Sequence, residues 1–249
     1  ASRAARRYAA GFAKSPVRKL LAALLLTVGP WSLLSLLLGP RVVPPPPAVF
    51  ARFWQLMISG LWLHAGASLA RVLFALGLAA IVALPLGIAI GRSKRLDMLL
   101  SPAAYLLYPV PKIALLPILL LLFGTGDLTR VIVVFLVLFF QVLLAVRDGA
   151  RSVSAVQLRS IDSLGGGRWD RFRFVIWPSV VPRLLTALRV GSGTALAVLF
   201  FAETFFTQFG LGFFIVDSWM KLSYLDMFAG ILAISLVGLL LFSAIDLIE

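Results

Sequence analysis

The sequence predicts an all-α, polytopic membrane protein with six transmembrane helices in one domain, residues 1–249. Hydrophobic residues make up 61% of the chain and charged residues only 13%, whereas a water-soluble domain carries roughly 25% charged residues. The mean hydropathy is +1.03, and no polar stretch is long enough for a soluble domain. The cations cluster at the ends of apolar runs, so the net charge of +13 indicates lipid headgroups and not nucleic acid.

The first part of the chain holds two predicted spans. A helix that crosses about 30 Å of hydrocarbon needs roughly 20 apolar residues. Residues 20–38 are uncharged, and no small-residue cleavage site is evident, so we expect a retained first span. The four prolines at 44–47 predict extended chain, and residues 50–63 indicate an amphipathic piece at the interface. Residues 72–91 form the second span.

Four further spans follow. Residues 98–126 contain one charge, Lys112, and form a third span that prolines interrupt. Residues 131–146 are short, but arginines at both ends can snorkel and extend this fourth span. Residues 184–202 form the fifth span, although Arg189 interrupts it and is explained only by pairing with another residue. Residues 227–245 form the sixth.

The distribution of lysine and arginine predicts the orientation of the chain in the membrane. With a cytoplasmic N-terminus, the internal segments 1–19, 92–97 and 147–183 hold 16 of the 23 cations, and the external segments hold four. Cytoplasmic segments are enriched in these residues. We therefore expect both termini on the cytoplasmic side, with a cytoplasmic loop of residues 147–182 between spans four and five.

This loop contains a segment that is too charged to cross a bilayer and too apolar for an ordinary loop. Residues 154–164 have a one-sided apolar pattern, which predicts a short helix. Gly165–Gly167 end it, because glycine readily adopts the left-handed conformation needed just past a helix. A second helix then presents aromatic side chains opposite arginines. We call residues 154–182 the knob. Its residue types are typical of protein interfaces, and they also fit a loop resting on anionic lipid.

Four residues are candidates for a translocation path. Pro109 and Pro111 must break helical hydrogen bonding, and freed carbonyls at membrane depth are tolerated only against protein or a wet cavity. A packing kink is the alternative. Lys112 would attract an anion, unless it snorkels to a headgroup or pairs inside the bundle. Glu203 ends span five, where it can gate the external mouth or be wet at the interface.

Other polar residues are weaker indications of a functional site. Asp127, Asp217 and Asp226 fall on the predicted external side, where they can meet an external protein partner or be solvated. His64, the one histidine, fits a headgroup contact better than a ligand role. The knob's glycines lack a following Gly-Lys-Ser/Thr, so the sequence predicts no nucleotide site in this chain.

Three stretches carry a family resemblance. The knob's "LGGGRWDRFRFVIWPSVVP" resembles the cytoplasmic loop of binding-protein-dependent ABC importer permeases, whose pattern is Glu-Ala-Ala, a glycine, a hydrophobic pair and a proline. Residues 68–130 and 201–218 resemble the same family, most closely its sulfonate, taurine and nitrate permeases. The corresponding knob residues are Gly165, Val175, Trp177 and Pro178, with Arg159, Ser160 and Ile161 in place of the Glu-Ala-Ala.

The resemblance implies a type I ABC importer permease in the bacterial cytoplasmic (inner) membrane that moves a small, anionic solute inward. It implies that the knob fits a groove on a separate ATPase subunit, which binds ATP and magnesium, so that this chain holds no cofactor. Further implied partners are a second permease copy or close relative and a periplasmic binding protein. The ATPase-coupling residues are then Arg159, Leu164, Gly165, Arg168, Trp169, Arg171, Phe172 and Pro178.

Two other classes compete with this interpretation. The sequence lacks the catalytic residues and motifs usual for an intramembrane enzyme, because it has no cysteine, only one histidine and no His-Glu-x-x-His motif. A stand-alone secondary carrier or channel would usually need an internal repeat or paired broken helices, and the sequence has neither. The carrier or channel is the alternative function.

Overall fold

The computed structural model describes residues 16–249, with side chains from residue 24 onward, and this part of the chain contains helices and no strand. The all-α fold class is therefore confirmed. The first 15 residues of the predicted N-terminal cytoplasmic segment lie outside the described residues. In chain order the helices are α2 (Pro16–Leu38), α3 (Pro46–Leu56), α4 (Trp62–Arg92), α5 (Lys94–Leu107), α6 (Leu116–Phe123), α7 (Asp127–Arg151), α8 (Ala155–Ser163), α9 (Arg168–Arg171), α10 (Trp177–Glu203), α11 (Leu211–Met220) and α12 (Tyr224–Ile248).

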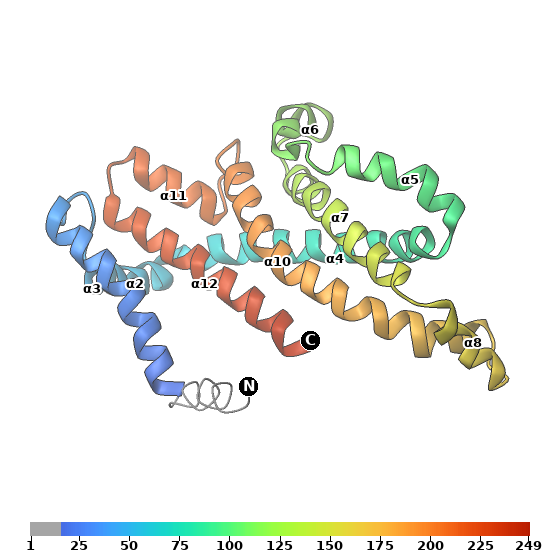
Figure 1. The fold of residues 1–249 in the computed structure, drawn as a ribbon. Helices are drawn as coiled ribbons and strands as arrows, with labels where there is room; N and C mark the ends of the chain where they lie inside the picture. The colour runs from blue at the N-terminus through green and yellow to red at the C-terminus, as the bar shows by residue number, and fades with distance from the viewer. Residues whose placement is uncertain (1–15) are drawn as a thin grey trace.

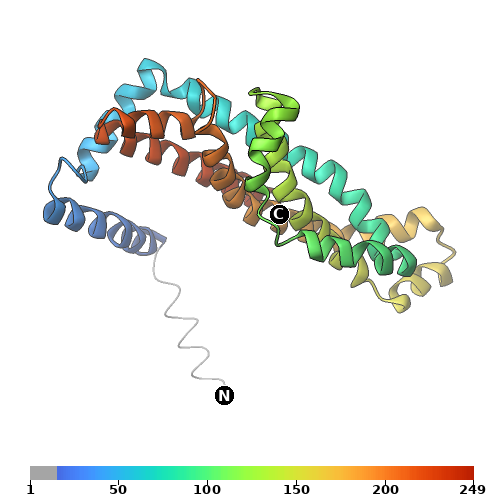
Figure 2. The same cartoon turned by 90° about the horizontal axis from the view of Figure 1, so that it is seen from above.

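Helices α4, α7 and α10 pack lengthwise against one another and form the centre of the molecule (Figure 1). Small residues on α4 allow this close approach: Ala75, Ala79 and Ala83 are fully buried. Helix α12 packs on α10 and α3, whereas α2 stands away from the central helices (Figure 2). Helix α8 lies at one end of the molecule, the knob end, and α3 and α11 lie at the other, the α11 end.

Four helical runs in the described residues are long and apolar enough to cross a membrane: Pro46–Arg92, Asp127–Arg151, Arg168–Glu203 and Tyr224–Ile248. Helices α5 and α6, with the 3-10 turn Lys112–Leu115 between them, form a pair bent by 81° that can count as a fifth span. The predicted first span coincides with a shorter apolar helix, Leu24–Leu38. The count of six stays a prediction.

Contrary to the sequence prediction, the four prolines at 44–47 are not all in extended chain. Pro45 is extended, with φ −68° and ψ 146°, but Pro46 and Pro47 lie in the first turn of α3, where a proline has no N–H bond to lose. The predicted amphipathic piece 50–63 is not a separate helix. It belongs to α3 and the start of α4, with a kink at Gly60, whose φ is 128°.

The loop between the fourth and fifth spans is shorter than the predicted 147–182. Helix α7 continues to Arg151, and the helix that begins at Arg168 runs through a π-helical turn, Phe172–Ile176, directly into α10. The π-helical turn immediately precedes Pro178, which stands in the first turn of α10 and can donate no backbone N–H. Pro178 therefore lies in α10 and not in a loop.

Candidate functional site

The knob is a helix, a glycine turn and a second helix, as the sequence predicts. Ser154 caps α8, because its Oγ accepts the N–H of Gln157 at 3.2 Å while the Gln157 Oε1 accepts the N–H of Ser154 at 2.9 Å. Gly165 follows with φ +79°, a left-handed conformation that favours glycine. The Asp170 carboxylate then accepts the N–H of Gly167 at 2.8 Å and so starts α9.

The outer surface of the knob is apolar and aromatic. Leu164 is 84% exposed and Trp169 is 66% exposed, although both are large hydrophobic residues. Trp169 stacks on Phe172 with ring centroids 5.5 Å apart, and Phe172 in turn contacts Trp177 at 5.8 Å. Arg171 pairs with Asp162 across the glycine turn at 2.5 Å. Of the predicted coupling residues, Arg159 and Arg168 are exposed, Phe172 is half-buried, and Pro178 is exposed on α10.

A charge cluster fastens the end of α7, just before the knob, to α5. The Asp97 carboxylate accepts hydrogen bonds from Arg147 at 2.6 Å and 2.7 Å and from Ser101 at 2.6 Å, and it also lies 3.2 Å from Arg151. Arg147 contacts the Tyr105 hydroxyl at 2.9 Å. Sequence reasoning missed this cluster, because residues 97 and 147 meet only once α5 folds back along α7.

Replacing Asp97 with Asn is expected to lower the free energy of unfolding by about 2 kcal/mol, because Arg147 is nearly buried and loses the charged oxygen, Asp97 Oδ1, that accepts two of its N–H groups. Asp148→Asn is the matched control. It also removes a carboxylate from Arg147, at 2.9 Å, but Asp148 is about half exposed, so we expect a loss of less than about 1 kcal/mol. Thermal unfolding of the purified chain in detergent measures both, and equal losses would contradict the assigned role of Asp97.

Helical structure is interrupted at Pro109–Pro111, between α5 and the 3-10 turn, as predicted. Lys112 follows the break and its residue is only 7% exposed, so it does not snorkel to a headgroup. Its ammonium instead donates to the carbonyls of Leu107 at 2.5 Å and Tyr108 at 2.6 Å, although the Leu107 carbonyl also accepts the N–H of Val110 at 3.2 Å. Beside Lys112 lies a cavity of about 350 Å³ that Gln141 of α7 and Thr194 of α10 also line.

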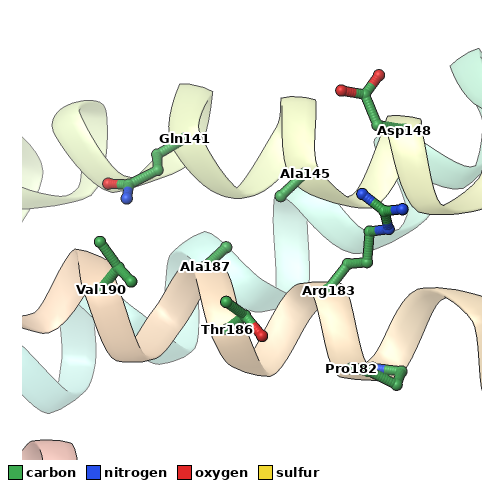
Figure 3. A pocket seen from close by; sticks show the side chains of 8 residues that line it. All are labelled: Gln141, Ala145, Asp148, Pro182, Arg183, Thr186, Ala187 and Val190. Atoms are coloured by element: carbon green, nitrogen blue, oxygen red, sulfur yellow. The ribbon is translucent and has the colours of Figure 1, made fainter. Parts of the chain in front are cut away.

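A second cavity, of about 480 Å³, continues along the same two helices toward the knob end (Figure 3). Gln141 lines both cavities, so they are neighbours, and we call the two together the groove between α7 and α10. Asp148 and Arg183 bring charged groups to the knob-end cavity. Arg189 lines neither cavity and pairs with Asp246 at 2.5 Å and Glu249 at 2.9 Å, which confirms its pairing, although at an exposed site where the Asp246 side chain is 56% exposed.

Glu203 lies in a buried network at the α11 end. The residue is fully buried, so it is not wet at an interface. Its carboxylate accepts hydrogen bonds from Arg71 at 2.6 Å, from Ser68 at 2.8 Å and from the N–H of Gly212 at 2.9 Å. Gly210 has φ +135°, and a Cβ there would lie 2.4 Å from the Glu203 carboxyl carbon. Glu203 therefore holds the start of α11 against α4.

Neighbouring residues close the same end. Arg130 is buried and donates to the carbonyls of Thr125, Gly126, Phe205 and Phe206 at 2.6–2.8 Å, which ties two loops together. His64 was expected to contact a headgroup, but its Nδ1 lies 3.2 Å from both the N and O of Gly210. The aspartates at this end are paired: Asp127 with Arg71, Asp217 with Lys221 and Asp226 with Arg52.

Sequence comparison connects this architecture to known proteins. Residues 83–249 match the protein family described as binding-protein-dependent transport system inner membrane component. The chain is 35% identical to the taurine transport system permease protein TauC of Escherichia coli (strain K12), over 88% of this chain and 82% of that protein. It is 31% identical to the putative aliphatic sulfonates transport permease protein SsuC of Bacillus subtilis (strain 168), over 84% and 76%. It is 30% identical to the nitrate import permease protein NrtB of Leptolyngbya laminosa, over 86% and 80%.

Proposed function

This chain belongs to the family of binding-protein-dependent transport system inner membrane components and is a permease subunit of an ABC importer, and we propose that it carries a small anionic solute into the cytoplasm. The names of three relatives support the solute class, because taurine, aliphatic sulfonates and nitrate all carry a compact oxyanion. The family assignment favours this function over a stand-alone carrier or channel.

The knob is the proposed contact with a separate ATPase subunit, which would bind ATP and magnesium, while this chain holds no cofactor. Exposed Leu164 and Trp169, beside Arg159 and Arg168, support a protein partner, because aromatic and arginine side chains are enriched at the centres of interfaces. The charge cluster of Asp97 and Arg147 supports transmission of movement from the knob, since it fastens the end of α7, which leads into the knob, to α5.

The proposed path runs along the groove between α7 and α10, past the break at Pro109 and Pro111. Lys112 contributes positive charge to this path, and Glu203 controls its outer mouth by holding α11. One chain has too few helices to enclose a pore by itself, so a second permease copy or close relative would complete the path. A periplasmic binding protein would deliver the solute to the α11 end. Both termini are then cytoplasmic.

Co-purification tests this function. The full chain, tagged and extracted in mild detergent from cells that also express an ATPase subunit, should recover that subunit in about equal amount. The pair should hydrolyse ATP faster when solute-loaded binding protein is added. Deleting residues 155–171 should lose the ATPase, whereas Lys221→Ala at the α11 end should keep it. If the knob deletion retains the ATPase, the knob is not the coupling element.

A further inference from the structure

Lys112 is a buried cation with no carboxylate partner. Among the described residues, the buried arginines Arg71 and Arg147 each pair with two carboxylates at 2.6–2.9 Å, and buried Arg130 donates to four carbonyls. Among residues 16–249, by contrast, no carboxylate lies within salt-bridge distance of the Lys112 ammonium, and the residue is 7% exposed. Burying an uncompensated charge is costly, so this site favours an anion that the chain does not supply.

The Lys112 ammonium has one unused hydrogen-bond donor. An ammonium carries three N–H donors, and in the described part of the chain Lys112 gives two of them, to the carbonyls of Leu107 and Tyr108. The Phe140 ring lies 4.8 Å from the ammonium nitrogen and adds no acceptor of hydrogen-bond strength. One N–H therefore has no hydrogen-bond acceptor from this part of the chain.

Two further polar side chains on the cavity also lack partners. Neither the Gln141 amide nor the Thr194 hydroxyl makes a hydrogen bond to any described residue, although most other polar groups near the spans do. Thr194 is exposed and Gln141 is half-buried in the single chain, and both lie near the middle of their helices, α10 and α7, where lipid offers no acceptor or donor. An amide and a hydroxyl beside a cation are suited to the several oxygens of one oxyanion.

We propose that Lys112, Gln141 and Thr194 form a binding site for the oxyanion group of the solute, within the 350 Å³ cavity at the break between α5 and α6. This inference rests on the proposed function and deepens it by placing a point of solute selection inside the membrane. The Lys112 N–H, the Gln141 amide and the Thr194 hydroxyl each donate to one oxygen. An uncharged molecule of the same size receives no charge-assisted bond and binds more weakly.

Direct binding tests the site without the binding protein. The full chain with its ATPase subunits in lipid nanodiscs is titrated with methanesulfonate, with nitrate and with neutral methanesulfonamide. At least one anion should bind, and the neutral probe should bind about tenfold more weakly or worse. Lys112→Met should weaken anion binding by at least about tenfold, and Thr194→Val and Gln141→Leu by roughly three- to tenfold each. Lys112→Arg should restore most of the affinity.

The controls separate binding from folding. Lys221→Met removes an exposed lysine at the α11 end and should leave anion binding unchanged. Thr194→Val and Gln141→Leu keep the carbonyl bonds of Lys112, so they test the site even if Lys112→Met fails to fold. The inference is overturned if neither anion binds, or if the Thr194 and Gln141 variants both bind the anions as tightly as the unaltered protein. It is also overturned if the substitutions weaken binding of neutral methanesulfonamide as much as they weaken binding of the anions. Such a failure leaves ATPase co-purification intact, whereas lost co-purification would overturn the proposed function itself.

Discussion

Trp169→Ala is expected to weaken binding of the ATPase subunit by at least about 30-fold, which corresponds to about 2 kcal/mol. Trp169 is 66% exposed at the tip of the knob, and its ring is held in place by stacking on Phe172 at 5.5 Å. A large, preorganised aromatic side chain of this kind anchors protein interfaces. Because the ring contacts little of the helical bundle, its removal should hardly change the free energy of unfolding.

Titration of the detergent-solubilised chain with the ATPase subunit measures this loss. Trp219→Ala is the matched control, since Trp219 is 57% exposed but lies on α11, at the opposite end of the molecule (Figure 1). Gly165→Val should reproduce the loss by another route, because valine is strained at φ +79° and must change the angle between α8 and α9. Equal affinities of the Trp169 and Trp219 variants would remove the knob from the ATPase interface.

The knob was predictable because its signals are local. A one-sided apolar pattern and a glycine turn act within a few residues, and each is found where the sequence places it. The break after Pro109 was predictable for the same reason. The end of the loop was not, because a proline normally stops a helix and here a π-helical turn carries the helix into α10.

Long-range pairings were not predictable. Arg71 and Glu203 are far apart in sequence, and their contact exists only because α4 and α10 pack together at the α11 end. Pattern alone therefore left Glu203 as a gate or a solvated residue, although it is fully buried. Helix α11 was also missed, because its ten residues are too few for a span and its apolar sequence lacks a cap that pattern reasoning recognises.

Glu203→Gln is expected to lower the free energy of unfolding by about 3 kcal/mol, a shift in Tm of roughly 6–12 °C for a chain of this size. The substitution keeps the shape of the side chain and removes its charge. Buried Arg71 then loses its charged partner at 2.6 Å and keeps only Asp127, whose side chain is largely exposed. The start of α11 loosens as well, because the N–H of Gly212 and the hydroxyl of Ser68 donate to the same carboxylate.

A double-mutant cycle with Arg71→Met isolates the pair. If the loss comes from an uncompensated buried charge, the double variant should be more stable than the two single losses predict, with a coupling of at least about 1.5 kcal/mol. Asp217→Asn is the control at the same end. It breaks an exposed pair with Lys221 and should cost less than about 0.5 kcal/mol. Additive losses in the cycle would mean that Glu203 acts through Gly212 and Ser68 alone, and the buried ion pair would then contribute nothing to holding α11 against α4.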